Sequence, residues 1–191
     1  IRDKIAALKH ELSEVELNRK TQRKQRGKIP SVALVGYTNA GKSSLLNALT
    51  GSEAFVENKL FATLDPLTRK MPLNESAGVL LTDTVGFISN LPHHLIDAFK
   101  STLEEAVDAD LLLLVLDSSD PDIEFQYETV CDVLADIGAD KNPRIVLLNK
   151  IDKTDENPEL LQTARLKHPN AICVSAKEEK GFLELKDRIY E

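Results

Sequence analysis

The feature that most constrains the fold of this chain is an eight-residue segment with the pattern G-x-x-x-x-G-K-S. It consists of Gly36, Tyr37, Thr38, Asn39, Ala40, Gly41, Lys42 and Ser43. An apolar run at 32–35 precedes the segment and a helix-type run at 44–50 follows it. Between a strand and a helix, this pattern is typical of phosphate-binding loops, whose backbone N–H groups point at a phosphate beside a helix N-terminus. The sequence therefore predicts a nucleotide-binding site.

The last two residues of this segment and the residue directly after it supply the polar groups that a bound nucleotide needs. Lys42 is expected to reach the outer phosphates and to take part in catalysis. The hydroxyl of Ser43 is expected to bind the Mg²⁺ ion that accompanies the phosphates. Ser44 completes the phosphate contacts that we predict here.

A second motif, D-x-x-G, follows the apolar run at 78–82. It consists of Asp83, Thr84, Val85 and Gly86. Asp83 lies at the C-terminal end of an expected strand, where its carboxylate can hold Mg²⁺ through water, and the N–H group of Gly86 can face a γ-phosphate. The motif is weak alone, because many strands end in an aspartate. With the first motif, it predicts a metal site at Ser43 and Asp83, and a catalytic role for Gly86.

Two further segments predict which base is bound. Asn149, Lys150 and Asp152 follow the apolar run at 144–148, and Ser175, Ala176 and Lys177 follow the run at 171–174. The carboxylate of Asp152 can accept hydrogen bonds from the ring N–H and the exocyclic amine of guanine. Adenine offers neither group there, so binding it would leave a buried charge unpaired. The four motifs in this order predict a site for GTP and GDP.

In these motifs the chain resembles the HflX family of GTPases. The similarity is strongest in residues 35–43, 60–66, 83–88, 91–93 and 102–105, and it extends over nearly the whole chain. The resemblance implies a ribosome-associated GTPase that acts on the large ribosomal subunit and its RNA. It also implies a further domain upstream of residue 1, as in other members of the family.

The connection between the first expected helix and the next strand resembles the switch segment of the family. Its predicted nucleotide contacts are Phe61, Ala62, Thr63, Leu64 and Asp65. Thr63 is the candidate for a second hydroxyl ligand of Mg²⁺ when a γ-phosphate is present, and it would then also be catalytic. Thr68 is the alternative, and the resemblance favours Thr63.

Phe87 occupies the position where Ras-type GTPases carry a glutamine that orients the attacking water. Neither Phe87 nor Ile88 can form a hydrogen bond to water through its side chain. We therefore expect slow intrinsic hydrolysis that a partner stimulates. His93 and His94 are alternative water-positioning groups, although a helix start or a solvent-facing position also explains them.

Asn39 is a second departure from Ras-like loops, which often carry glycine at this place. Its side-chain carbonyl would lie beside the β- and γ-phosphates, where it could help to hold a potassium ion. Such an ion would stabilise the negative charge that develops during hydrolysis. The alternative is that Asn39 only bonds to the loop or to a bridging oxygen, and the sequence leaves both open.

Alternating strand-like and helix-like runs predict the fold. We expect strands near 32–36, 67–73, 78–83, 111–116, 144–149 and 171–174. We expect helices near 42–50, 93–107, 122–137, 157–167 and 181–190, the last one cut short at Glu191. This order predicts an α/β P-loop GTPase domain with a mostly parallel sheet and helices on both faces. The 191 residues, 42% of them hydrophobic, suffice for one such core.

Residues 1–28 form a different region, an α-helical basic arm that precedes a GTP-binding domain at 29–191. An apolar seam spaced by four and three residues runs along its first half, through Ile1, Ile5, Leu8, Leu12 and Val15. This seam either packs on a second helix or docks on the GTP-binding domain. The arm has a net charge of +5, which leaves −12 for the rest of a chain of net charge −7. The positive charge would favour contact with RNA phosphates. The alternative is a solvated run of charges, since cations are favourable at the C-terminus of a helix.

The remaining features limit the class of protein. No apolar run approaches the roughly 18 residues of a membrane span, and Cys131 and Cys173 suggest reduced thiols. We expect a monomeric protein of the cytoplasm, or of an organellar matrix in a eukaryote. The chain begins at Ile1 and not at Met, so we expect it to be part of a longer protein. The alternative functions are a GTPase of ribosome assembly or RNA modification, and a GTP-binding module with negligible turnover.

Overall fold

The computed structural model describes residues 29–51, 66–87 and 103–191. The predicted basic arm at 1–28, the switch segment around Thr63 and most of the expected helix at 93–107 lie outside these residues. The described residues from Ser31 onward belong to one compact unit. The division of the chain into an arm and a GTP-binding domain at residue 28 stays a prediction.

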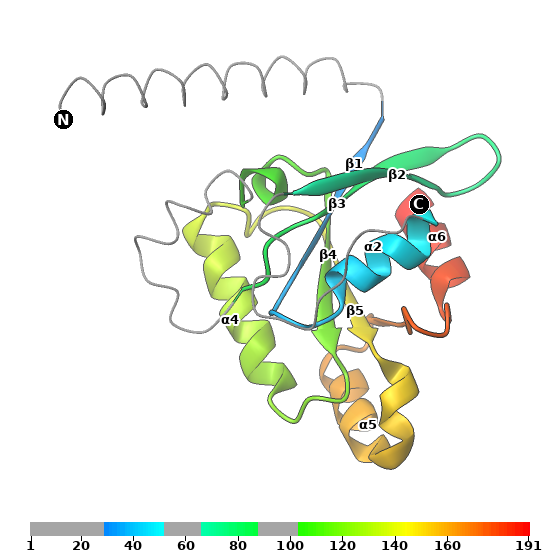
Figure 1. Ribbon diagram of the computed structural model, residues 1–191. Coiled ribbons are helices and arrows are strands. Elements are labelled where there is room, and N and C mark those ends of the chain that lie inside the picture. The colour runs from blue at the N-terminus through cyan, green and yellow to red at the C-terminus, as the bar shows by residue number, and fades with distance from the viewer. Residues whose placement is uncertain (1–28, 52–65, 88–102) are drawn as a thin grey trace, which may run out of the picture. The chain divides into compact units, whose positions relative to one another are not determined.

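A six-stranded sheet, in the order β2-β3-β1-β4-β5-β6, organises this unit (Figure 1). Its strands are β1 Ser31–Gly36, β2 Leu67–Pro72, β3 Gly78–Asp83, β4 Leu111–Asp117, β5 Arg144–Asn149 and β6 Ile172–Cys173. β2 pairs with β3 in the antiparallel sense, and every other pair is parallel. The mostly parallel sheet expected from the sequence is confirmed.

Helices connect these strands and cover the sheet. They are α2 Lys42–Thr50, α4 Ile123–Asp136, α5 Pro158–Lys167 and α6 Phe182–Tyr190, and a 3₁₀-helix, η1, spans Ile151–Glu156. Residues 103–107 are also helical. Within the part of the chain that the structure describes, no helix combines the length and the apolar character needed to cross a membrane.

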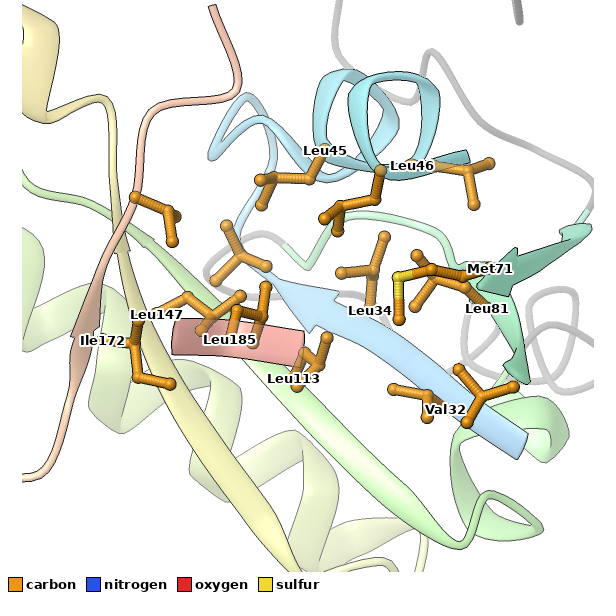
Figure 2. Packing of buried hydrophobic residues seen from close by; sticks show 14 of the residues in the cluster. Val32, Leu34, Leu45, Leu46, Met71, Leu81, Leu113, Leu147, Ile172 and Leu185 are labelled. Carbon is orange, nitrogen blue, oxygen red and sulfur yellow. The ribbon is translucent and has the colours of Figure 1, made fainter. Parts of the chain in front are cut away.

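The two faces of the sheet bury separate clusters of apolar side chains. Val32 and Leu34 of β1 belong to one cluster, which α2 and α6 cover. Figure 2 shows this cluster, in which Leu45 and Leu46 of α2 lie over Leu34 of β1. Ala33 of β1 belongs to the other cluster, which α4, α5 and the helical turn at 103–107 cover. Helices therefore lie on both faces, as the sequence predicts.

β4 is the strand whose sequence most directly reflects this arrangement. Residues 112–116 are all buried, because alternate side chains enter opposite clusters. The 3₁₀-helix η1 was not expected from the sequence. It forms by i→i+3 hydrogen bonds, such as Lys153 N–H to the Lys150 carbonyl at 2.9 Å, and so short a 3₁₀-helix needs no apolar period of its own.

Candidate nucleotide-binding site

The polar motifs of the sequence meet at one edge of the sheet. β1, β3, β4 and β5 run parallel, so their C-terminal ends point the same way. Gly36 and Asp83 end β1 and β3, while Asp117 and Asn149 end β4 and β5 as neighbours in register. The edge formed by the carboxyl ends of parallel strands is where open α/β sheets bind their ligands.

The segment from Gly36 to Ser43 is a loop that leads from β1 into the N-terminus of α2. Gly41 has a φ of 97°, and a Cβ atom at this position would collide with the side-chain amide of Asn149. Only glycine therefore permits both the turn at Gly41 and the close approach of Asn149 at the end of β5. The N-terminus of α2 gives this loop the partial positive charge that favours an anion.

The side chain of Lys42 lies within the loop. Its Nζ donates to the Gly36 carbonyl at 3.1 Å and to the Tyr37 carbonyl at 2.9 Å. Burial lowers the pKa of Lys42 to about 8, and this effect outweighs the opposing attraction of Asp83, while the charge of Lys150 lowers the pKa further. An anion bound in the loop would reverse this balance, because it would stabilise the ammonium form.

The hydroxyl of Ser43 donates to Asp83 Oδ2 across a distance of 2.6 Å. A hydroxyl from the start of α2 and a carboxylate from the end of β3 thus form a pair of hard oxygen ligands. Mg²⁺ prefers such ligands, and it commonly takes one or two protein oxygens and completes its shell with phosphate and water. The residues present fit Mg²⁺ on the basis of this donor set. Thr84 fixes the chain directly after Asp83, because the hydroxyl of Thr84 donates to the Leu34 carbonyl at 2.6 Å.

The D-x-x-G segment is bonded to the phosphate-binding loop through its backbone. The N–H of Phe87 donates to the Gly36 carbonyl at 3.1 Å, and the N–H of Thr38 donates to the Phe87 carbonyl at 2.8 Å. A Cβ on Gly86 would lie 2.8 Å from Thr38 Cα, so a side chain cannot be placed there without displacing backbone. The ring of Phe87 is buried in the core cluster under α4, where it cannot orient a water molecule in the site.

Asn149 joins the predicted base-binding segments to the loop. Its side-chain amide donates to the Ala40 carbonyl at 2.8 Å, and its side-chain oxygen accepts from the N–H of Ala176 at 3.2 Å. Asp152 Oδ1 accepts from the hydroxyl of Ser175 at 2.6 Å. The segments at 149–152 and 175–177 are therefore held against each other and against the loop, and Asp152 is oriented by Ser175.

Of the other predicted site residues, Ser44 lies half-buried in the first turn of α2, and Lys177 is exposed in the loop after β6. Thr68, the alternative switch threonine, lies in β2, where its hydroxyl is 2.9 Å from that of Thr82. The predicted contacts Phe61, Ala62, Thr63, Leu64 and Asp65, and also His93 and His94, lie outside the described residues.

Two residues of the site were missed by sequence reasoning. Asp117 accepts from Lys150 Nζ at 2.7 Å, and the N–H and hydroxyl of Ser118 both donate to the Asn149 carbonyl, at 2.9 and 2.7 Å. The signal was present in the sequence, because Asp117 directly follows the apolar run at 111–116, as Asp83 follows its own strand.

Comparison with known proteins identifies the family. Residues 31–150 match the family described as 50S ribosome-binding GTPase. The chain belongs to this family. Among its relatives, a protein named GTPase HflX from Caldanaerobacter subterraneus is 51% identical over 191 residues, which cover 99% of this chain and 43% of that protein. The resemblance to HflX GTPases is thereby confirmed, although the chain spans less than half the length of this relative.

Solved structures of proteins in complex with guanine nucleotides share the fold of this chain. A GTP-binding protein from Sulfolobus solfataricus in complex with GDP is 31% identical, with a TM-score of 0.65, covering 94% of this chain and 58% of that chain. Era in complex with MgGDPNP and nucleotides 1506–1542 of 16S ribosomal RNA is 27% identical, with a TM-score of 0.65, covering 85% of this chain and 56% of that chain.

The lowered pKa of Lys42 predicts a pH dependence of nucleotide affinity. The pKa of Lys42 is about 8 without a ligand, and a bound phosphate needs the ammonium form, so affinity is lost as the pH rises through this value. We expect the affinity for GDP to fall about fourfold between about pH 7 and about pH 8.5, measured by isothermal titration calorimetry. Lys42→Arg keeps its charge at both pH values and should show no such fall. A flat profile for the unmutated protein would contradict the assignment.

Proposed function

We propose that this chain is the GTP-hydrolysing switch of an HflX-like protein that acts with the large ribosomal subunit. The observation that carries the proposal is the bonding of Asn149 to both Ala40 and Ala176, which places the segment that carries Asp152 against the phosphate-binding loop. A phosphate loop alone would suit many nucleotides, whereas this combination suits GTP and GDP. Membership in a GTPase family supports the same proposal.

In this proposal the site residues divide into three groups. Lys42 stabilises the outer phosphates, the N–H of Gly86 faces the γ-phosphate, and Ser43, Asp83 and Thr63 hold Mg²⁺. Bound there, the metal would neutralise the charge on the phosphates. Asp152 selects guanine, supported by Ser175. The remaining contacts are the backbone and side chains of 36–44, 61–65, 83–86, 149–150 and 175–177.

The partner in this proposal is the large ribosomal subunit and its RNA. The basic arm at 1–28 and the upstream region expected for the family would supply the RNA contacts, because the rest of the chain carries a net charge of −12. Acidic residues repel phosphates, whereas lysine and arginine gain affinity by releasing counterions. We also propose that the protein is monomeric and works in the cytoplasm.

Base selection by Asp152 is directly testable. Asp152→Asn should lower the affinity for GDP by roughly ten- to a hundredfold and favour xanthosine diphosphate, because the changed group no longer complements the guanine edge. The asparagine oxygen can still accept from Ser175, so the loop is expected to keep its shape. Competition for binding measures both affinities, with Asp136→Asn, an exposed carboxylate on α4, as the control. Equal affinity of the unmutated protein for ATP and GTP would exclude this role.

Partner-stimulated hydrolysis tests the function as a whole. Because Phe87 cannot orient water, the protein alone should hydrolyse GTP no faster than about the 10⁻⁴ s⁻¹ scale of unassisted Ras. Large ribosomal subunits should accelerate it about 10³- to 10⁵-fold, which corresponds to roughly 4–7 kcal/mol of barrier. Phosphate release with large subunits, with small subunits and without either measures the effect. Fast turnover by the protein alone would show that a residue outside this proposal is catalytic.

Potassium is the proposed source of further positive charge at the reacting phosphates. Asn39 lies exposed in the loop with a φ of 61°, and its side-chain oxygen could help to hold the ion there. Hydrolysis should be faster in KCl than in NaCl at matched ionic strength, and Asn39→Ala should abolish the difference. The measurement is phosphate release in both salts. Identical rates for the unmutated protein would leave Asn39 with a role in loop structure only.

A further inference from the structure

The carboxylate of Asp117 has a separate partner for each of its oxygens. Oδ2 lies 2.7 Å from Lys150 Nζ, and Oδ1 accepts from the N–H of Ser119 at 3.0 Å and from its hydroxyl at 2.6 Å. The side chains of Asp117 and Lys150 are only 14% and 16% exposed. Removing one charge from such a pair leaves the other poorly solvated, so the two side chains depend on each other.

Lys150 carries this contact to the phosphate-binding loop. The same Nζ donates to the Asn39 carbonyl at 2.6 Å. Lys150 has a φ of 64° and Asn39 a φ of 61°, so both occupy the left-handed backbone region that residues other than glycine rarely adopt. Backbone of this kind persists where its surroundings hold it. An unbroken chain of contacts therefore runs from the end of β4 to the middle of the loop.

We propose that Asp117 is a positioning residue for nucleotide binding, an inference that rests on the proposed function. Its carboxylate holds the ammonium of Lys150, and Lys150 holds the Asn39 carbonyl. This fixes the peptide that follows Asn39, whose N–H group, that of Ala40, donates to the Tyr37 carbonyl at 3.3 Å and so closes the turn of the phosphate-binding loop. Asp117 thereby slows the release of GDP and GTP without contacting either.

Charge repulsion alone would predict the opposite effect of Asp117 on nucleotide affinity. Asp117 is a negative charge near a site for phosphates, so neutralising it would strengthen nucleotide binding if charge repulsion were its main effect. Neutralising it would weaken binding if its main effect is to position Lys150. The direction of the change therefore separates the two explanations.

The experiment measures release of N-methylanthraniloyl-GDP, a fluorescent nucleotide, from the protein after addition of excess GDP. Asp117→Asn removes the charge and keeps an oxygen for Ser119, and we expect release about tenfold faster. Asp117→Glu keeps the charge on a longer side chain, and its release rate should fall between that of Asp117→Asn and the unmutated protein. The matched control is Ser119→Ala, which removes a partner of the other carboxylate oxygen and should release the nucleotide at the unmutated rate.

The order of the rates decides the outcome. Release from Asp117→Asn that is as slow as, or slower than, release from the unmutated protein would overturn the proposal. Faster release from Asp117→Glu than from Asp117→Asn would also overturn it, because packing and not charge would then be the cause. Release counts only folded, nucleotide-bound molecules, so loss of folding does not mimic the effect. This outcome can be told apart from failure of the proposed function, because in that case the unmutated protein would not bind the nucleotide at all.

Discussion

The side-chain amide of Asn149 is the contact on which the rest of the site depends. It donates to the Ala40 carbonyl and accepts from the N–H of Ala176, so one buried residue bonds to two loops that are distant in sequence. An amide can do this because it carries a donor and an acceptor on one rigid group. An aspartate would lose the donor, and a leucine would leave the buried Ala40 carbonyl and the half-buried N–H of Ala176 without their partner.

The parallel sheet makes this contact possible. Parallel strands need crossover connections, so the parallel strands of this sheet all end at the same edge. The ends of β1, β3, β4 and β5 thus bring polar residues together, while their buried middles fill the two clusters on either face. Gly41 is also required for the contact of Asn149 with the loop, because the absence of a Cβ atom at Gly41 leaves the space that the Asn149 amide occupies.

Sequence reasoning predicted the sheet and the motifs because both leave periodic or local signals. Apolar runs marked the strands, and glycine and polar residues at their ends marked the loops. Contacts that depend on spatial neighbours left no such signal. The pairing of Asp117 with Lys150 joins residues 33 positions apart, and η1 rests on the local conformation of Lys150. The 3₁₀ turn has no apolar period, and an aspartate at a strand end does not reveal which lysine it meets.

Lys42 and Lys150 act on the loop in the same way. Both donate to loop carbonyls, Lys42 to Gly36 and Tyr37 and Lys150 to Asn39, and each lies near an aspartate that ends a strand. In a trans peptide the C=O and N–H bonds point in opposite directions. Carbonyls turned toward the lysines therefore direct the adjoining N–H groups the other way. The two lysines thus help to hold the backbone of the loop before any phosphate binds, together with the N–H groups of Thr38 and Ala40, which donate to the carbonyls of Phe87 and Tyr37.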